Sequence, residues 1–154
     1  MHATLGWERL AGAGLWTTDV RGYVGFVGST VLALRGEAAR ADAPLPRSEQ
    51  VLLGGSDSVR GYRAGHRAGD STAAVSAEIR VPLTSPLSYG RFGVKAFADA
   101  GTTWASRERL RKQQFDRGIG GGLYFGATAF AANVDVAWPE RGKPRVHAGV
   151  GVTF

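Results

Sequence analysis

Hydrophobic residues alternate with small or polar residues through most of the chain. In the last segment, for example, Val146, Val150 and Phe154 fall on one face and His147 falls on the other. Because successive side chains of a strand point to opposite sides, this period of two predicts β-strands. Five consecutive segments follow it: 73–81, 91–99, 117–126, 128–138 and 145–154. Each has about ten residues, the length that a tilted strand needs to cross a membrane.

The amino-terminal part of the chain predicts further strands. Segments 16–26 and 30–41 form a candidate hairpin, and segment 2–10 is a candidate strand. Between these strands and the later five lies segment 42–72, which is rich in Gly, Ser and Arg and far longer than an ordinary connection. We therefore expect seven or eight antiparallel strands in one domain, 1–154, with a long functional loop at about 42–72.

Charge and aromatic residues distinguish a soluble protein from a membrane protein. Alternation alone suits both a soluble β-sandwich, which buries its apolar face, and a barrel, which turns that face to lipid. The apolar faces of the five later strands are nearly free of charge, and aromatic residues stand near strand ends: Phe92, Trp104, Trp138 and Phe154. No apolar run reaches the roughly 18 residues of a transmembrane helix. The pattern favours an all-β, antiparallel transmembrane β-barrel.

The composition is basic and contains no cysteine: the formal net charge is +6, and 23 of the 154 residues are glycine. A basic chain suits an anionic partner, so a soluble basic β-sandwich that binds such a partner remains the alternative of another class. The basic run 107–112 has no interleaved aromatic platform, which argues against nucleic acid.

His2, His66 and His147 are too scattered for a metal site. Segment 118–122 is Gly-rich but lacks the ending of a phosphate-binding loop, so no cofactor is expected.

Three motifs follow one another in a specific order. Segment 53–62, Leu-Gly-Gly-Ser-Asp-Ser-Val-Arg-Gly-Tyr, precedes Ser-Ala-Glu at 76–78 and Phe-Ala-Asp-Ala-Gly at 97–101. In this order they resemble the motifs of the bacterial surface antigen superfamily, which comprises outer-membrane assembly factors of the BamA and TamA type and the related two-partner secretion transporters. The resemblance covers residues 28–154, and the order of the three motifs is more specific than any one of them.

The resemblance implies a sixteen-stranded barrel preceded by periplasmic POTRA repeats, of which this chain would be the carboxyl-terminal half, in the outer membrane of a Gram-negative bacterium. The implied function is insertion of outer-membrane proteins or export of a polypeptide, so we expect no enzymatic activity. The implied partners are outer-membrane lipids, unfolded outer-membrane or secreted polypeptides, and POTRA repeats upstream of Met1. Residues 1–10 lack the basic segment and apolar run of a signal peptide, so we expect none there. Phe154 resembles the terminal aromatic residue by which such barrels are recognised for insertion.

Three branches of the superfamily remain open. The lead-in Asp57-Ser58 and the compact loop resemble the assembly-factor and surface-antigen branch more than the two-partner secretion transporters. A third branch fuses the barrel to a patatin-like lipase, which would lie outside this chain. The sequence upstream of Met1 would distinguish the three.

The candidate functional motif in the loop consists of Val59, Arg60, Gly61 and Tyr62. The resemblance implies that the loop folds into the barrel lumen, where Arg60 pairs with Asp99 and lies near Glu78. The parity of the strands independently places Glu78 and Asp99 on the inward face, and a guanidinium suits one or two carboxylates. Gly61 is expected to adopt positive φ or permit close backbone approach, and Tyr62 to pack with its hydroxyl paired.

Overall fold

The computed structural model describes residues 1–10, 12–83, 90–127 and 130–152, which contain ten β-strands and one 3-10 helix. The main sheet consists of β1 (His2–Leu10), β2 (Ala13–Gly25), β3 (Val31–Ala41), β6 (Ser71–Leu83), β7 (Gly90–Trp104), β8 (Asp116–Ala127), β9 (Phe130–Pro139) and β10 (Arg145–Val152). The shorter elements are β4 (Val51–Leu53), β5 (Arg67–Gly69) and helix η1 (Leu110–Lys112). No helix in these ranges is long and apolar enough to cross a membrane.

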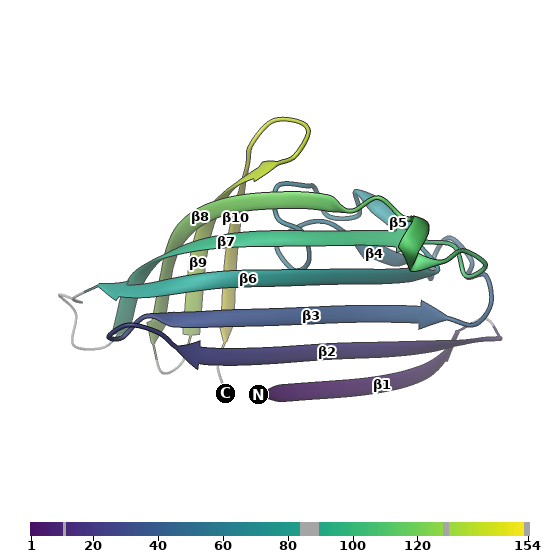
Figure 1. Cartoon of the computed structure of the whole chain (residues 1–154), viewed down its shortest axis with the longest axis horizontal. Coiled ribbons are helices and arrows are strands. Elements are labelled where there is room, and N and C mark those ends of the chain that lie inside the picture. The colour runs from purple at the N-terminus through teal and green to yellow at the C-terminus, as the bar shows by residue number, and fades with distance from the viewer. Residues whose placement is uncertain (11, 84–89, 128–129, 153–154) are drawn as a thin grey trace.

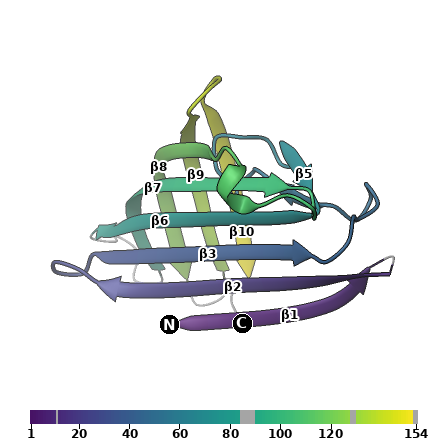
Figure 2. The same ribbon diagram turned by 45° about the vertical axis from the view of Figure 1, so that its right-hand side comes forward.

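The eight long strands form one antiparallel sheet in the order β1-β2-β3-β6-β7-β8-β9-β10, with β1 and β10 as its edges. Strands β4 and β5 pair separately. The sheet curls so that β8, β9 and β10 stand behind β6 and β7, and the loop that carries β4 and β5 lies on its concave side (Figures 1 and 2). The predicted all-β antiparallel class is confirmed: the sheet is part of a barrel, and the described strands do not form the two packed layers of a sandwich.

Most predicted strands agree with the observed ones to within a few residues, the end of β7 differs more, and the predicted loop contains two short strands. Strand β7 continues to Trp104, beyond the predicted end at Asp99, because its last residues pair with the first residues of β6. The loop predicted at 42–72 ends at Asp70 and contains the β4–β5 pair. Strands of three residues are too short to show a readable alternation, so the sequence pattern did not reveal them.

The two faces of the main sheet differ as the alternation predicted. On the convex face, Val75, Ile119 and Val150 are 58, 62 and 80 % exposed. On the concave face, Glu78 and Asp99 are 6 and 3 % exposed. A water-soluble protein gains most of its stability by burying apolar side chains, whereas this sheet buries carboxylates and turns its apolar side chains outward.

Aromatic side chains lie near strand ends. The ring centroids of Trp7 in β1 and Trp16 in β2 are 6.1 Å apart, and both side chains are exposed. Trp104 ends β7, and Trp138 is the last residue but one of β9. Such aromatic residues are typical of the boundary between membrane and water. Phe154, the predicted insertion signal, lies outside the described residues.

The long loop supplies apolar packing to the concave side. Leu53, Val59 and Tyr62 of the loop form a buried cluster with Ala74 of β6. A second cluster joins Leu45 of the loop to residues of β2 and β3. Because both clusters contain loop residues, the loop is docked on the sheet and is not a solvated tether.

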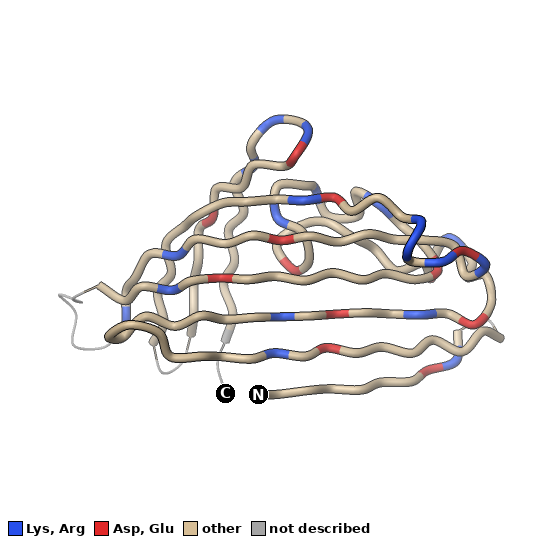
Figure 3. The backbone as a smooth tube through the Cα atoms, viewed as in Figure 1, with Lys and Arg blue, Asp and Glu red and all other residues tan. Residues whose placement is uncertain are grey.

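The basic run 107–112 lies in the exposed connection between β7 and β8. Figure 3 shows Lys and Arg gathered there, while Asp and Glu also occur along the middle of the strands. The net positive charge therefore does not mark one continuous basic surface.

The exposed apolar face leads to a prediction about solution behaviour. We expect the 154-residue chain to aggregate in plain buffer and to become monodisperse only in detergent, because the convex face is apolar and both β1 and β10 have an unpaired edge. Size-exclusion chromatography with and without detergent measures this. A monodisperse monomer with a reversible thermal transition in plain buffer would contradict it.

Candidate functional site

The loop reaches the sheet through a tight backbone path. Ser58 Oγ accepts a hydrogen bond of 2.8 Å from the N–H of Gly54, which closes a small turn ahead of Arg60. Gly61, directly after Arg60, has φ of +98° and passes close to the backbone of Pro139 at the end of β9. A side chain at this position would be strained by the backbone conformation and would meet Pro139. Gly61 therefore has both a positive φ and a close backbone neighbour.

Arg60 and Asp99 form the centre of the site. Nε and Nη2 of Arg60 donate to the two carboxylate oxygens of Asp99 at 2.7 and 2.9 Å. The backbone N–H of Arg60 donates to the same carboxylate at 3.1 Å. Two parallel hydrogen bonds from a guanidinium to a carboxylate fix orientation as well as distance. The contact expected between Arg60 and Asp99 is present.

Three further side chains surround the guanidinium. Nη1 of Arg60 donates to Glu78 of β6 at 2.6 Å. Ser76 Oγ accepts from Nη2 at 3.1 Å and donates to Asp99 at 2.7 Å, so it links the arginine to its partner. The Cζ atom of Arg60 lies 3.4 Å from the centre of the Phe97 ring, within the range of a cation–π contact. Arg60 thus contacts both carboxylates that the sequence had indicated.

The ionic cluster extends to β9 and is balanced in charge. Asp135 of β9 lies 3.5 Å from Nη1 of Arg60 and 2.9 Å from Nζ of Lys95. Nε of Arg80 lies 2.6 Å from Glu78. The cluster therefore pairs three cations with three carboxylates: Arg60, Arg80 and Lys95 with Glu78, Asp99 and Asp135. All five N–H groups of the guanidinium have an acceptor.

Burial makes this pairing necessary. The Arg60 side chain is only 8 % exposed. Burial by itself lowers the pKa of the guanidinium, but the hydrogen bonds and charges of Asp99 and Glu78 outweigh it and raise the pKa above its ordinary value. Removing one partner of a buried ion pair costs about 3–5 kcal/mol, because the other charge is left uncompensated. The cluster therefore makes docking of the loop sensitive to each of its members.

Glycines in the neighbouring strands make room for the loop. A Cβ on Gly118 of β8 would overlap the carbonyl oxygen of Arg60. A Cβ on Gly101 of β7 would lie 2.8 Å from Val59 and 2.9 Å from Leu53. The Gly-rich segment 118–122 thus forms a floor beneath the loop and its partners.

The residues after Arg60 attach the loop to β8 and β10. The N–H of Gly61 donates to Nε2 of His147 in β10 at 3.0 Å, which requires that this nitrogen carry no proton. The hydroxyl of Tyr62 donates to the carbonyl of Arg117 in β8 at 3.2 Å. Burial, followed by the charge of Asp116, raises the pKa of the Tyr62 hydroxyl, so it keeps the proton that it donates.

Sequence reasoning gave no role to several members of the site. Asp135, Lys95 and Arg80 had been assigned none, and Ser76 and Phe97 were known only as parts of motifs. His147 had been considered only as a metal ligand and rejected. Asp135 and Lys95 offered one usable signal, since a lone charge on the inward face of a membrane strand requires a partner. Nothing in the sequence connects Gly61 to His147.

Asp70, at the end of the long loop, is hydrogen-bonded to the start of the same loop and to the β7–β8 connection. Its two carboxylate oxygens accept hydrogen bonds of 2.9 Å from the N–H groups of Leu45, near the start of the loop, and Ser106, in the β7–β8 connection. Burial raises the pKa of this carboxyl, but the hydrogen bonds from Ser106 and Leu45 outweigh it and hold the pKa below its ordinary value. Ionised Asp70 therefore stabilises the closed arrangement.

Gly118 offers a test of the floor beneath the loop. We expect Gly118→Ala to displace Arg60 and to destabilise the docked loop by about 1–3 kcal/mol, the usual cost of overpacking. Limited trypsin cleavage at the exposed Arg63 measures the displacement. Gly126→Ala is the matched control, because Gly126 lies on the same strand and a Cβ there meets nothing within 4 Å. Equal cleavage of the two variants would contradict a role for the floor.

The lowered pKa of Asp70 predicts that the attachment of the loop depends on pH. Because its folded pKa is depressed, its stabilising effect is complete above the ordinary value of 3.8 and is lost as the pH falls through the folded value. We expect the protection of the Leu45 and Ser106 amides against hydrogen exchange, corrected for intrinsic rates, to fall below about pH 4. Asp70→Asn should remove this dependence. Amide protection that stays constant in the wild type down to about pH 2 would contradict the stabilising role of ionised Asp70.

Comparison with known families gives one clear result. The model of the Omp85 superfamily domain matches residues 14–154, which include the long loop and every strand that contributes to the Arg60 cluster. No curated protein matches the sequence. Members of this superfamily are outer-membrane transporters or assembly factors. By the extent of this match, the chain belongs to the Omp85 superfamily.

Proposed function

We propose that this chain is the carboxyl-terminal part of an outer-membrane β-barrel that inserts or translocates polypeptides, and that the loop 42–70 holds the barrel in its working conformation. The observation that carries the proposal is the buried cluster around Arg60, which ties the loop to β6, β7 and β9 at once. An element tied to three strands resists their relative movement, which suits a barrel that must stay open to a substrate without losing its shape.

The chemistry of the cluster favours a conformational role over simple stabilisation. Well-packed apolar residues often stabilise a protein as much as a buried ion pair does, or more. A bidentate guanidinium with every N–H occupied instead selects one position of the loop, because a small displacement would break several hydrogen bonds together. The cluster therefore specifies where Arg60 sits more than it adds stability.

The proposal includes a location and partners. The convex face would contact outer-membrane lipids, and the substrates would be unfolded outer-membrane or secreted polypeptides. POTRA repeats upstream of this chain would complete the protein, and Phe154 would serve as the signal for insertion.

We assign the chain to the assembly-factor and surface-antigen branch, with the two-partner secretion transporters and the lipase-fused barrels as alternatives. Asp57 and Ser58, which directly precede the loop motif, support this assignment because they shape the loop. The carbonyl of Asp57 accepts a hydrogen bond from Arg35 of β3, and Ser58 holds the turn at Gly54. Asp57 thus attaches the loop to β3, and Ser58 shapes the turn within the loop.

The proposed function is tested by a double-mutant cycle in the full-length protein. We expect Arg60→Ala and Asp99→Ala each to reduce the amount of substrate barrel inserted, or of polypeptide exported, and to expose the loop to trypsin. The physical reason is the uncompensated buried charge, which costs about 3–5 kcal/mol. The double variant should be no worse than either single variant, because the two residues act as one unit.

Arg109→Ala provides the control, since Arg109 is exposed in the β7–β8 connection and has no ion pair among the described residues. Its insertion or export activity should equal that of the wild type. Arg60→Lys should remain impaired, because an ammonium cannot reproduce the bidentate contact. Normal insertion and export by Arg60→Ala, with the loop exposed to trypsin, would refute the role of the loop.

A further inference from the structure

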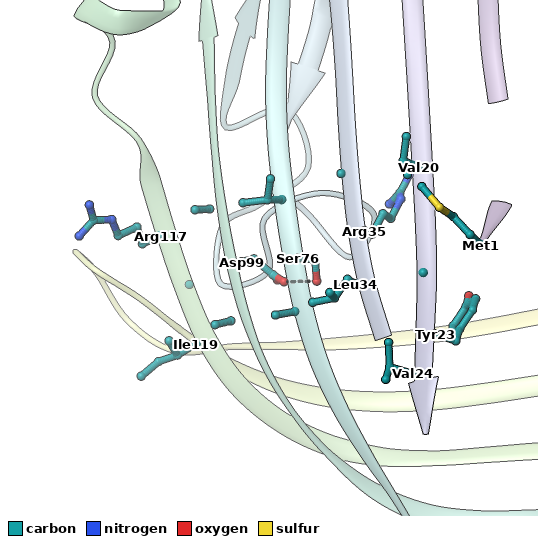
Figure 4. A pocket seen from close by; sticks show the side chains of 17 residues that line it. Met1, Val20, Tyr23, Val24, Leu34, Arg35, Ser76, Asp99, Arg117 and Ile119 are labelled. Atoms are coloured by element: carbon teal, nitrogen blue, oxygen red, sulfur yellow. Dashed lines mark hydrogen bonds between the residues drawn. The ribbon is translucent and has the colours of Figure 1, made fainter. Parts of the chain in front are cut away.

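A groove of about 850 Å³ crosses the convex face of the sheet, opposite the Arg60 cluster. Figure 4 shows part of its lining, with Val24 on β2, Leu34 on β3 and Ile119 on β8. Gly22 and Gly36 contribute no side chain, and a Cβ at either position would meet nothing within 4 Å. The groove is therefore an open, apolar channel on the surface that the fold turns toward lipid.

The strand register gives the groove a direction. One row of its lining consists of five residues that pair in turn across five neighbouring strands: Val20, Gly36, Val75, Ala100 and Arg117. Arg117 is the second residue of β8, whereas Gly36 is the middle residue of β3. Four spacings of about 4.8 Å make a row of about 19 Å. Because membrane strands tilt by about 35–45° from the membrane normal, a row of this length across the strands descends by about 11–13 Å, which lies within the roughly 15 Å of hydrocarbon in one leaflet.

Arg117 closes the groove at the end nearest the loops. Its side chain is exposed, lies on the apolar face and has no ion pair among the described residues. Two residues further along β8, Ile119 pairs with the exposed Trp138 of β9, and tryptophan is typical of the membrane boundary. An unpaired guanidinium at this depth suits a phosphate, which it can bind with two hydrogen bonds.

We propose that this groove binds a phosphate-bearing membrane lipid, with the phosphate on Arg117 and one acyl chain lying over Ala98 and Gly36 toward the middle of the sheet. The inference requires only that the convex face meets lipid, and it is independent of which polypeptide the barrel handles. Charge and shape both select this occupant, since the cation lies at the boundary end of the groove and the apolar channel leads inward from it.

The test is native mass spectrometry of the protein purified in detergent, titrated with dipalmitoyl phosphatidylglycerol. We expect a complex with one bound phosphatidylglycerol. Dipalmitoylglycerol, which lacks the phosphate, should not replace this lipid, and neither should glycerol phosphate, which lacks the acyl chains. Arg117→Gln should weaken binding about tenfold, the effect of losing charge-assisted hydrogen bonds. Arg40→Gln is the control, because Arg40 is an exposed arginine of β3 outside the groove.

A second pair of variants tests the channel itself. Ala98→Leu fills the groove and should abolish retention of the lipid, whereas Ala96→Leu, on the same face of β7 but outside the groove, should not. Equal binding by these two variants, or equal binding of dipalmitoylglycerol and phosphatidylglycerol by the wild type, would overturn the proposal. Dimers that disappear on Ala98→Leu would overturn it too, because the occupant would then be a second copy of the chain.

Discussion

The arrangement of this protein depends on one buried guanidinium. Arg60 belongs to the long loop and points toward the sheet, almost out of contact with solvent, where an unpaired charge would be strongly unfavourable. It is stable there because Glu78, Asp99 and Asp135 reach it from three strands, and because Lys95 and Arg80 balance the remaining negative charge. The requirement for charge balance determines where the loop docks, and the loop in turn covers part of the concave side of the sheet.

The requirement for space is equally strict. The loop can approach the sheet only where side chains are missing, which explains why Gly118 and Gly101 lie directly below Arg60 and Val59. Residues that look like a weak phosphate-binding motif in the sequence are therefore a packing surface. The same argument applies to Gly61, whose positive φ and closeness to β9 leave no room for a side chain. Ion pairs hold the loop on the sheet, and glycines leave the space that its backbone occupies.

The alternation that buries charge on one face exposes apolar residues on the other. The concave face is specialised for holding the loop, and the convex face is suited to lipid. The apolar face is not uniform, because glycine and alanine open a channel that leads from Arg117 toward the middle of the sheet. On both faces small residues create space, for the docked loop on the concave face and for the proposed lipid on the convex face.

The sequence by itself determined the long strands, their faces and the motif, since a period of two and the order of three motifs are local properties of a chain. It placed Glu78 and Asp99 inward and indicated Arg60 as their partner. Tertiary structure alone decided that Asp135 and Lys95 complete the cluster, that His147 accepts from Gly61, and that a groove crosses five strands. The physical reason is that strand register and loop docking bring together residues far apart in the chain, and no local pattern records those distances.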